Sequence, residues 1–298
     1  MVITNIIGGL GNQLFMYAAA RRLAHIHNVP LRLDISGFKK DDKWSRLRTY
    51  RLKYFNIKAE IATTNEISRL KGINQKGVNW KILNINKRIG HYYRQSYVKE
   101  RNFHFDPAIL KLSGNVYMDG YWQSEKYFSD IEDIIRREFT LAESPDKLNF
   151  EFAKRIEKSS SISIHIRRGD YIEDSEALSL HGTLGLDYYS RAINFISEKV
   201  RDPHFYVFSD DYEGAKRNIK IDYPATFVKY NNAEKDYADL WLMSLCKHHI
   251  IAHSTFSWWG AWLNNNPDKM VIAPKRWFAD EKMNSQTKDL IPEGWIRL

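Results

Sequence analysis

The chain has 298 residues, 43% hydrophobic and 27% charged, so it is long enough to bury a sizeable core and is globular rather than disordered. Its net charge of +9 favours an anionic partner: nucleic acid, an anionic membrane surface or a phosphorylated small molecule. One cysteine, Cys246, excludes an internal disulfide and a cysteine-built zinc cluster, and fits a reducing compartment. The start lacks a signal-peptide pattern, and no apolar run approaches the roughly 20 residues that span a bilayer. We therefore expect a soluble, cytoplasmic protein.

The first 35 residues predict a strand, a turn, a helix and a second strand. Residues 2–7 are apolar, residues 8–13 are glycine-rich, residues 14–27 have a wide apolar arc at helical spacing, and residues 31–35 are apolar again. This βαβ order indicates a parallel sheet.

The glycine turn imitates a dinucleotide-binding fingerprint, which leaves an NAD-dependent dehydrogenase as an alternative function. Gly9 and Gly11 follow the strand, and Asp34 ends the next one. Leu14 occupies the third glycine position, where its bulk opposes the close packing that the fingerprint requires. A plain turn therefore explains the glycines better.

Two polar residues, Asn12 and Gln13, follow this turn. They lie at the predicted helix N-terminus, where side chains and backbone N–H groups can hydrogen-bond a ligand.

Residues 36–120 carry no motif. Within them, residues 87–104 interleave basic and aromatic side chains, a pattern that also occurs in nucleic-acid and carbohydrate binders. A solvated amphipathic face is the simpler interpretation, and a non-catalytic binder remains the second alternative function.

The middle of the chain predicts a domain boundary. Residues 124–139 have apolar side chains at helical spacing, and residues 142–146 are the best linker. We expect one domain over residues 1–145 and a second over residues 146–298.

The stretch Ser161 to Tyr171 begins as a strict alternation. Its isoleucines fall on one face of a strand, and His165 and Arg167 fall on the other. Arg168 and Gly169 break the pattern, so the strand ends there. In an open α/β sheet, ligands bind outside the carboxyl ends of the strands. Two adjacent guanidiniums at such an end suit a diphosphate, although a pair with a carboxylate such as Asp170 is the alternative.

Two later strand ends also carry polar clusters. Asp210 and Asp211 follow the apolar strand 204–208, and the strand 250–252 leads into a run that contains Ser254, Thr255 and Ser257. A carboxylate can accept the N–H pair of guanine, whereas hydroxyls at a helix start can bind phosphate. One of the two aspartates can instead cap the helix that follows. Together these three strand ends can bind a nucleoside diphosphate.

We find no convincing metal-ligand cluster in the sequence. His249 and His253 have the spacing of a helical zinc pair, but residues 250–252 between them are predicted as strand. Four residues of strand separate two rings by about 13 Å, too far to share one ion.

Four motifs resemble those of the α-1,2-fucosyltransferases, glycosyltransferase family 11, and they occur along the chain in the same order as in that family. They are His165-Ile166-Arg167-Arg168-Gly169-Asp170-Tyr171, the N-terminal Gly8-Gly9-Leu10-Gly11-Asn12-Gln13-Leu14-Phe15, Phe208-Ser209-Asp210-Asp211, and Ser254-Thr255-Phe256-Ser257-Trp258-Trp259. Together they span residues 8–259. The absence of a membrane anchor makes the chain similar to bacterial members of the family.

The resemblance implies a GT-B fold, an α/β architecture of two Rossmann-like domains that face each other across a cleft. The second domain would bind GDP-L-fucose, and the first would lie on the acceptor side. Fucose would be added, with inversion and without a metal or other cofactor, to the 2-hydroxyl of a terminal β-galactoside, in glycan or O-antigen synthesis. A peripheral contact with the inner membrane face fits such a role and the basic charge.

The resemblance also implies roles for individual residues. Arg168 would stabilise the leaving diphosphate, with Arg167 in support. Four carboxylates follow the arginines and are candidates for a general base, although a dissociative reaction needs little help from a base: Asp170, Glu173, Asp174 and Glu176. The donor would also contact His165, the two aspartates, the three hydroxyl residues, Asn12 and Gln13.

Overall fold

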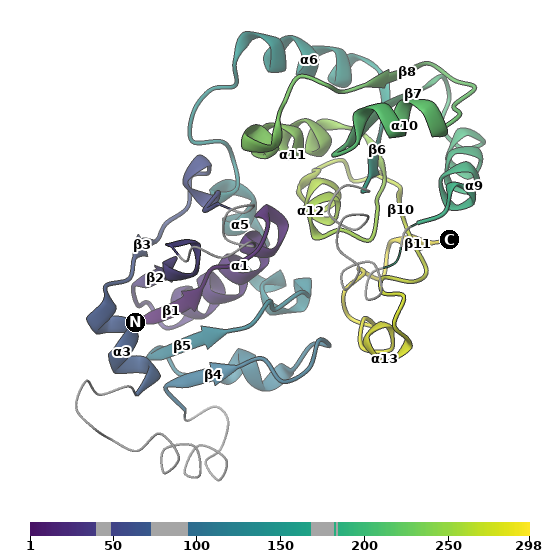
Figure 1. Cartoon of the computed structure of the whole chain (residues 1–298). Coiled ribbons are helices and arrows are strands. Elements are labelled where there is room, and N and C mark those ends of the chain that lie inside the picture. The colour runs from purple at the N-terminus through teal and green to yellow at the C-terminus, as the bar shows by residue number, and fades with distance from the viewer. Residues whose placement is uncertain (40–48, 73–94, 168–181, 183) are drawn as a thin grey trace. The chain divides into compact units, whose positions relative to one another are not determined.

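The computed structural model describes residues 1–39, 49–72, 95–167, 182 and 184–298, and these residues fold as two compact units, Met1–Thr140 and Leu141–Leu298 (Figure 1). The boundary predicted from the sequence lies after residue 145, and these units divide after Thr140. Each unit is an α/β structure built on one parallel sheet. Within the described residues, no helix combines the length and the apolar character needed to cross a bilayer.

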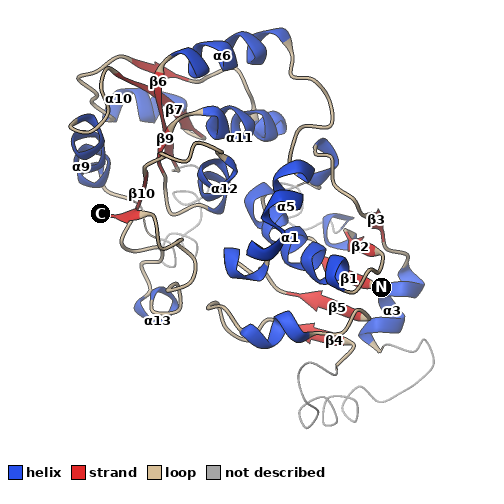
Figure 2. Cartoon of the chain, turned by 180° about the vertical axis from the view of Figure 1, so that it is seen from behind, coloured by secondary structure: helices blue, strands red, loops and turns tan. Residues whose placement is uncertain are grey.

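The first unit has a five-stranded parallel sheet in the order β3-β2-β1-β5-β4 (Figure 2). Helix α3 packs on the sheet, and its Leu70 is buried in one cluster with Ile3 and Tyr117. Its elements are β1 (Val2–Asn5), α1 (Leu10–Ile26), β2 (Leu31–Asp34), β3 (Glu60–Ile61), α3 (Thr64–Lys71), β4 (Tyr97–Lys99), β5 (Val116–Asp119) and α5 (Glu132–Glu138).

The glycine turn ends sooner than the sequence pattern suggests. Gly8 has a φ of 76°, a conformation that favours glycine, and the helix then begins at Leu10 with Gly9 as its N-cap. Asn12 and Gln13 therefore lie in the first turn of α1.

The helix predicted over residues 124–139 is wrong in its first half. Two 3₁₀ turns, Glu125–Tyr127 and Ser129–Ile131, precede α5. Phe128 between them has a non-helical backbone, with φ −146° and ψ 10°.

The second unit has a six-stranded parallel sheet in the order β11-β10-β9-β6-β7-β8. Read from β6, the chain fills one side of the sheet and then the other, which is the Rossmann order. Its elements are α6 (Lys147–Lys158), β6 (Ser160–Ile166), α9 (Leu186–Ser197), β7 (Pro203–Ser209), α10 (Tyr212–Asn218), β8 (Ala225–Phe227), α11 (Asp236–Leu245), β9 (His248–Ile250), α12 (Thr255–Leu263), β10 (Val271–Ala273), α13 (Glu281–Asn284) and β11 (Ile296–Arg297).

The alternation along β6 divides this sheet into two faces. Ile162, Ile164 and Ile166 are buried in one cluster with residues of α9 and α10. On the opposite face, Tyr206 and Phe208 of β7 pack in a second cluster with residues of α6 and α11. Helices thus cover both faces, which the sequence alternation of strands and helices predicts.

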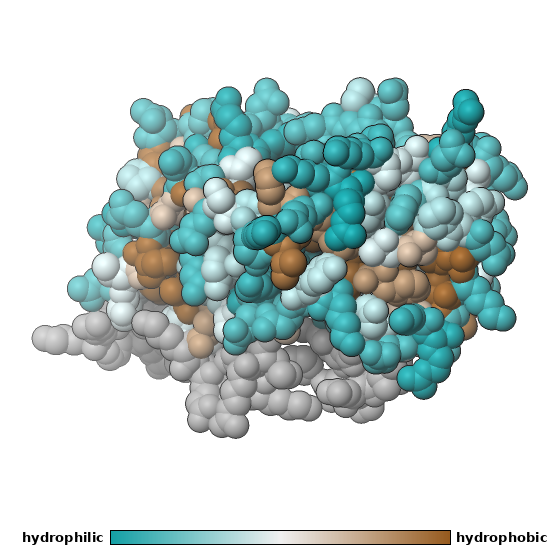
Figure 3. All heavy atoms as spheres, turned by 90° about the horizontal axis from the view of Figure 1, so that it is seen from above, coloured by the Kyte–Doolittle hydropathy of each residue, from teal (hydrophilic) through white to brown (hydrophobic). Residues whose placement is uncertain are grey.

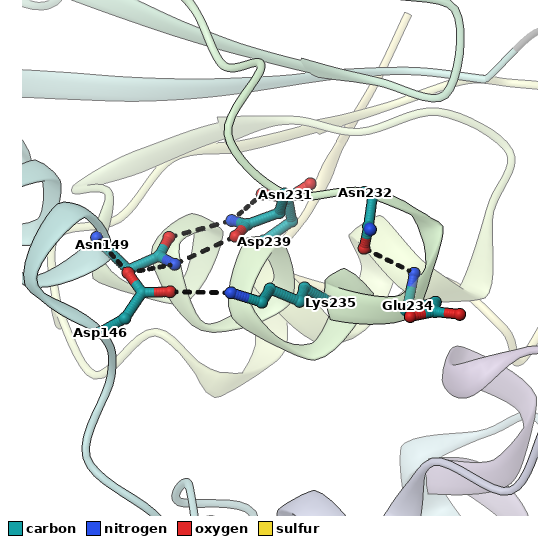
Figure 4. A network of polar contacts seen from close by, with 7 residues as sticks. All are labelled: Asp146, Asn149, Asn231, Asn232, Glu234, Lys235 and Asp239. Carbon is teal, nitrogen blue, oxygen red and sulfur yellow. Dashed lines mark hydrogen bonds and ion pairs between the residues drawn. The ribbon is translucent and has the colours of Figure 1, made fainter.

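A polar network joins the start of α6 to α11 (Figure 4). Asp146 caps α6 by accepting a bond from the backbone N–H of Asn149 at 3.0 Å, and Lys235 donates to its other oxygen at 3.0 Å. The amides of Asn149 and Asn231 bond each other at 2.9 and 3.0 Å, and Asn231 also donates to Asp239 at 2.7 Å. The predicted linker therefore ends in a fixed helix start.

On the face seen in Figure 3, most of the atoms that are not grey belong to hydrophilic residues. Figure 3 shows one face of the molecule, on which brown apolar atoms form small groups among teal hydrophilic ones. On α6, Leu148 and Phe150 are about half exposed, and Lys154 lies over the Phe150 ring at 4.3 Å from its centroid.

Candidate functional site

The order of the second sheet places a candidate site at the carboxyl ends of β6, β7 and β9. The chain leaves β6 toward β7 and β8, and it returns to the other side of β6 with β9. At such a reversal the connections leave the sheet edge in opposite directions and open a crevice between them. The three polar clusters of the sequence analysis follow these three strands.

Arg167 and Asp210 meet at this edge. Ile166 and Ser209 are partners in the register of β6 and β7, so the next residue of each strand emerges side by side. Arg167 Nη1 lies 3.2 Å from Asp210 Oδ2, and each side chain is about a quarter exposed. This ion pair orients one guanidinium at the edge, where an anionic ligand can reach it.

Asp211 has a different task. It is the N-cap of α10, and its carboxylate accepts a bond from the backbone N–H of Gly214 at 2.9 Å. A Cβ on Gly214 would lie 1.8 Å from Asp211 Oδ2, so this cap requires the glycine. Of the two adjacent aspartates, the helix cap is therefore Asp211.

His165 lies directly behind the ion pair, on the same face of β6 as Arg167. Its side chain is buried, and its Nδ1 has no hydrogen-bond partner among the described residues. Burial, followed by the charges of Arg167 and His253, lowers its pKa to about 3, so the ring is neutral at pH 7. A neutral imidazole can both donate to and accept from a ligand.

The hydroxyl cluster lies at the start of α12. Ser254 is the N-cap residue with extended backbone, Thr255 is the first helical residue and is partly exposed, and Ser257 is fully buried. Ser257 donates to the backbone carbonyl of Ser254 at 3.2 Å, which fixes the first turn. The backbone N–H groups of this turn are suited to an anion.

Asn12 and Gln13 belong to the first unit. Gln13 is fully buried, donates to the carbonyls of Gly8 and Thr49, both at 2.9 Å, and accepts from the backbone N–H of Arg51 at 2.9 Å. Its amide thus connects two loops of that unit. Asn12 accepts a bond from the Gln123 side chain at 3.0 Å and is partly exposed.

Asp34, the acidic residue of the dinucleotide alternative, is engaged within the fold. It is 1% exposed and accepts bonds from the Tyr117 hydroxyl at 2.7 Å and from the backbone N–H of Ser36 at 2.9 Å. Lys71 Nζ lies 3.5 Å from Asp34 Oδ2, the oxygen that also accepts from Tyr117. A ribose hydroxyl would have to displace these partners. This disfavours a dinucleotide site at Asp34, and with it a dehydrogenase function.

The other predicted catalytic residues lie outside the described residues. Arg168, Asp170, Glu173, Asp174 and Glu176 all fall within residues 168–181. Their roles stay predictions.

Two features at strand ends were missed in the sequence analysis. His253, considered there only as a metal ligand, lies close enough to influence the pKa of His165. Glu100 and Asp119, in the stretch without a motif, follow or end strands β4 and β5. The available signal was their position after short apolar runs, because strand ends of one parallel sheet gather at one edge.

The comparisons with known proteins point to one family. The model of glycosyl transferase family 11 matches residues 1–298. An alpha-1,2-colitosyltransferase of Escherichia coli is 34% identical, with 100% of this chain and 99% of that protein covered. The O-antigen biosynthesis glycosyltransferase WbnK of Escherichia coli is 35% identical, with 98% of each covered. Galactoside alpha-(1,2)-fucosyltransferase 2 of Sus scrofa is 24% identical, with 87% of this chain and 68% of that protein covered.

Among solved structures, the fold resembles NodZ alpha-1,6-fucosyltransferase soaked with GDP-fucose. The TM-score is 0.50 at 15% sequence identity, with 88% of this chain and 91% of that chain covered. This likeness concerns the fold. Together with the two parallel-sheet units, it confirms the predicted α/β fold of GT-B type with two Rossmann-like units.

Proposed function

Because the chain belongs to glycosyltransferase family 11, we propose that it transfers L-fucose from GDP-L-fucose to the 2-hydroxyl of a terminal β-galactoside, with inversion at the anomeric carbon. The product would contain a Fucα1-2Gal linkage. The family match over the whole chain and the relatives named for α-1,2 transfer support this reaction. They favour it over both a dehydrogenase and a non-catalytic binder.

The observation that carries the proposed donor site is the Arg167–Asp210 pair at the reversal of a Rossmann-ordered sheet. In this proposal Arg167 binds the diphosphate as a planar fork of donors, and the first turn of α12 contributes backbone N–H groups. His165 supports the same end of β6. Asp210 holds Arg167 in place, and in this proposal it also accepts from the guanine or acts through Arg167 alone.

The proposed reaction breaks the bond between fucose C1 and the β-phosphate oxygen and forms a bond from C1 to the acceptor oxygen. The bonding electrons leave with GDP, and the acceptor hydroxyl loses its proton to a base or to solvent. Guanidiniums that contact the β-phosphate stabilise the negative charge as it develops, so they lower the barrier rather than only tightening donor binding. We assign the main part of this stabilisation to Arg168 and a supporting part to Arg167.

A colitosyl donor is the second candidate. The 34% identical relative is named for colitose, which is L-fucose without its 3-hydroxyl. Both sugars have the same linkage chemistry at C1, so the site described above serves either donor equally well. The two donors differ only in whether a polar group must satisfy the fucose 3-hydroxyl.

A donor and acceptor panel tests the proposal. The purified full chain is incubated with GDP-L-fucose, GDP-colitose and UDP-galactose, each with β- and α-linked terminal galactosides, and products are read by mass spectrometry and by NMR of the new linkage. We expect an α1-2-linked product from GDP-fucose with β-galactosides. A colitosyl product alone would transfer the assignment to the second donor, and no glycosyl transfer from either GDP-sugar would reject the proposal.

A further inference from the structure

The sheet of the first unit has its own reversal, between β1 and β5, and polar side chains gather at the carboxyl ends there. Asp119 ends β5 and accepts bonds from the Asn5 amide at 3.1 Å and from the Tyr97 hydroxyl at 2.6 Å. Asn5 ends β1, and Tyr97 begins β4. Carboxyl ends at such a reversal are the usual place for a ligand in an open parallel sheet.

The segment that follows β5 is built around one carboxylate. Glu100 Oε2 accepts from the backbone N–H of Tyr121 at 2.7 Å, and Oε1 accepts from that of Trp122 at 3.0 Å. A Cβ on Gly120 would lie 2.3 Å from the Cβ of Glu100, so only glycine permits this approach. The bonds pin residues 120–122 against the end of β4.

Trp122 is held in an unusual backbone conformation. Its φ is 53°, a left-handed value that is rare for a bulky side chain. Such strain persists only where the surroundings enforce it, and it concentrates at ligand sites. Here the two bonds to Glu100 enforce it.

The indole of Trp122 supplies an independent sign of a ligand. The side chain is 1% exposed, and its Nε1 has no hydrogen-bond partner among the described residues. Its Cε2, the ring atom bonded to Nε1, lies 3.0 Å from the place of a Gly120 Cβ, so the N–H edge of the ring borders the same segment. A buried donor without a partner in a native fold calls for an explanation, and a bound hydroxyl provides one.

The segment also offers an aromatic surface and an ionisable acceptor. Tyr121 is 37% exposed, although the next residue, Trp122, is buried. Burial, together with the charge of Asp119, raises the pKa of Glu100 to about 7, against the opposing effect of the two backbone N–H groups. Glu100 is therefore an acceptor that changes charge near neutrality.

We propose that Glu100, Tyr121 and Trp122 form the acceptor-sugar subsite, which takes a neutral pyranoside with free hydroxyl groups. The inference rests on the proposed function and deepens it by assigning residues to the acceptor side. The Tyr121 ring packs on the apolar face of the sugar, Glu100 accepts from a sugar hydroxyl, and the Trp122 N–H donates to another. Apolar aromatic surface with a few fixed polar groups is the usual composition of a small-molecule site.

Tyr121→Ala is the main test, because Tyr121 is the most exposed of the three proposed residues. We expect the acceptor KM to rise at least tenfold, with kcat within about threefold and the Kd for GDP, measured by calorimetry, within about twofold. Tyr223→Ala is the matched control: Tyr223 is 40% exposed and its ring packs against Phe205 near the start of β7, whereas Asp210 follows the other end of that strand. It should leave the acceptor KM unchanged.

Glu100→Gln is the second variant, and exposed Glu151→Gln on α6 is its control. We expect the acceptor kcat/KM of the wild type to depend on pH near 7 and this inflection to disappear in Glu100→Gln. Asp119, Tyr97, Lys99 and Arg101 flank Glu100, and their charges are common to both proteins. If Glu100→Gln does not fold, the Tyr121 result decides.

An acceptor KM within twofold of wild type for Tyr121→Ala would overturn the inference while leaving the transferase assignment intact. Absence of transfer by the wild type itself would instead reject the proposed function. In that case binding of methyl β-galactoside, followed by saturation-transfer NMR on wild type and Tyr121→Ala, still tests the subsite, because equal signals in both proteins would reject it.

Discussion

At the residue scale, the adjacent residues Asp210 and Asp211 have different structural roles although they belong to one sequence motif. Asp211 satisfies an orphan N–H at the start of α10, whereas Asp210 extends β7 by one residue and meets Arg167 across the register. Either aspartate is compatible with a helix cap from the sequence alone, because aspartate is a preferred N-cap residue. The answer depends on the strand register, which no local pattern reveals.

Substituting the two aspartates separately should therefore have opposite effects: one substitution lowers stability, and the other lowers GDP affinity. We expect Asp211→Ala to lower the free energy of unfolding by about 1 kcal/mol through the lost cap and to leave GDP affinity within about threefold. Asp210→Asn should leave stability nearly unchanged, because its partner is partly exposed, and should weaken GDP at least tenfold. Chemical denaturation and calorimetry measure the two quantities.

The affinity for inorganic diphosphate, which lacks the guanine, distinguishes the two possible roles of Asp210. If Asp210 reads the guanine, diphosphate affinity is unchanged in Asp210→Asn, and if it orients Arg167, diphosphate weakens in parallel. Unaltered GDP affinity in Asp210→Asn would contradict both roles.

A second residue-scale prediction concerns the network at the start of α6. Burial, with a smaller contribution from the charge of Asp236, raises the pKa of Asp239 to about 7, although the bond from Asn231 opposes the shift. Between about pH 4 and pH 7 the folded state therefore binds more protons than the unfolded state, so the free energy of unfolding falls as pH rises. The slope from this one group is at most about 1.4 kcal/mol per pH unit.

Asp239→Asn should flatten this dependence. The test measures the difference in the free energy of unfolding between Asp239→Asn and wild type at pH 5 and at pH 8. This difference should favour the variant more at pH 8 than at pH 5. Asp187→Asn, at an exposed site on α9, is the control and should follow wild type. Parallel stability curves for Asp239→Asn and wild type would show that the buried carboxyl does not titrate in this range.

At the scale of elements, β6 combines an apolar and a polar column in one buried strand. Ile162, Ile164 and Ile166 fill one core cluster, while Ser161, Ser163 and His165 are equally buried on the other face. The polar column is tolerated because neighbouring strands partner it: Ser163 Oγ bonds His249 Nδ1 of β9 at 2.8 Å. The strand next to the reversal is thus connected through side chains as well as backbone.

Ser163→Ala should show how much this hydrogen bond contributes to the free energy of unfolding. It leaves His249 Nδ1 unpaired in the core, where burial already holds the histidine pKa well below its ordinary value. We expect a loss of about 1–3 kcal/mol in the free energy of unfolding, by urea titration. Ser159→Ala removes a hydroxyl that donates to the Ile156 carbonyl and lies 3.2 Å from the Tyr206 hydroxyl, and it should cost less because both contacts are only partly buried. An equal cost for both would mean that the cross-strand bond adds little.

Elements with a strong period were predictable from sequence, and those shaped by tertiary packing were not. The alternation of residues 161–167 predicted β6 because one face must be apolar. β9 is His248–Ile250 rather than residues 250–252, since its bounds follow from pairing with β6 and β10, not from its own hydrophobicity. The separation argued for His249 and His253 therefore rested on a strand that ends before residue 251.

The candidate site was predictable only as far as strand ends could be located. Arg167 and Asp210 were expected at one edge of a parallel sheet, and they meet there. Gln13 was expected at a ligand, but its bonds to residues 8, 49 and 51 depend on loops that the sequence left unassigned. Glu100 escaped notice because β4 has only three residues, too short for a periodic signal.

At the scale of the whole molecule, both units have a parallel sheet with a reversal in strand order. Each has a parallel sheet whose order reverses at one pair of strands, β1 and β5 in the first unit and β6 and β9 in the second, and each places polar groups at the carboxyl ends there. One protein thus has two edges suited to a ligand. A net charge of +9 agrees with a donor that carries a diphosphate.

Turnover should not require a divalent metal ion. In the proposed reaction, guanidiniums on the diphosphate perform the charge stabilisation that a metal ion performs in other phosphate chemistry. We expect the initial rate of fucose transfer to be unchanged by excess EDTA and by added Mg²⁺ or Mn²⁺. Arg167→Lys, which keeps the charge but loses the planar fork, should be slow in both conditions. Loss of turnover in EDTA that Mn²⁺ restores would show that the wild type needs an ion.

The strand order of the second unit has a consequence for how the donor edge comes into being. β6, β7 and β8 are consecutive both in the chain and in the sheet, so this half can pair soon after it leaves the ribosome. β9 must then find the open side of β6, pairing His248 with Ile162 across a long stretch of chain, and such distant pairing is slow to form. Until it docks, the Ser163 hydroxyl and the edge of β6 face solvent. The strand order therefore predicts that β9 pairs after β6, β7 and β8, and that the binding edge is complete only once β9 has docked.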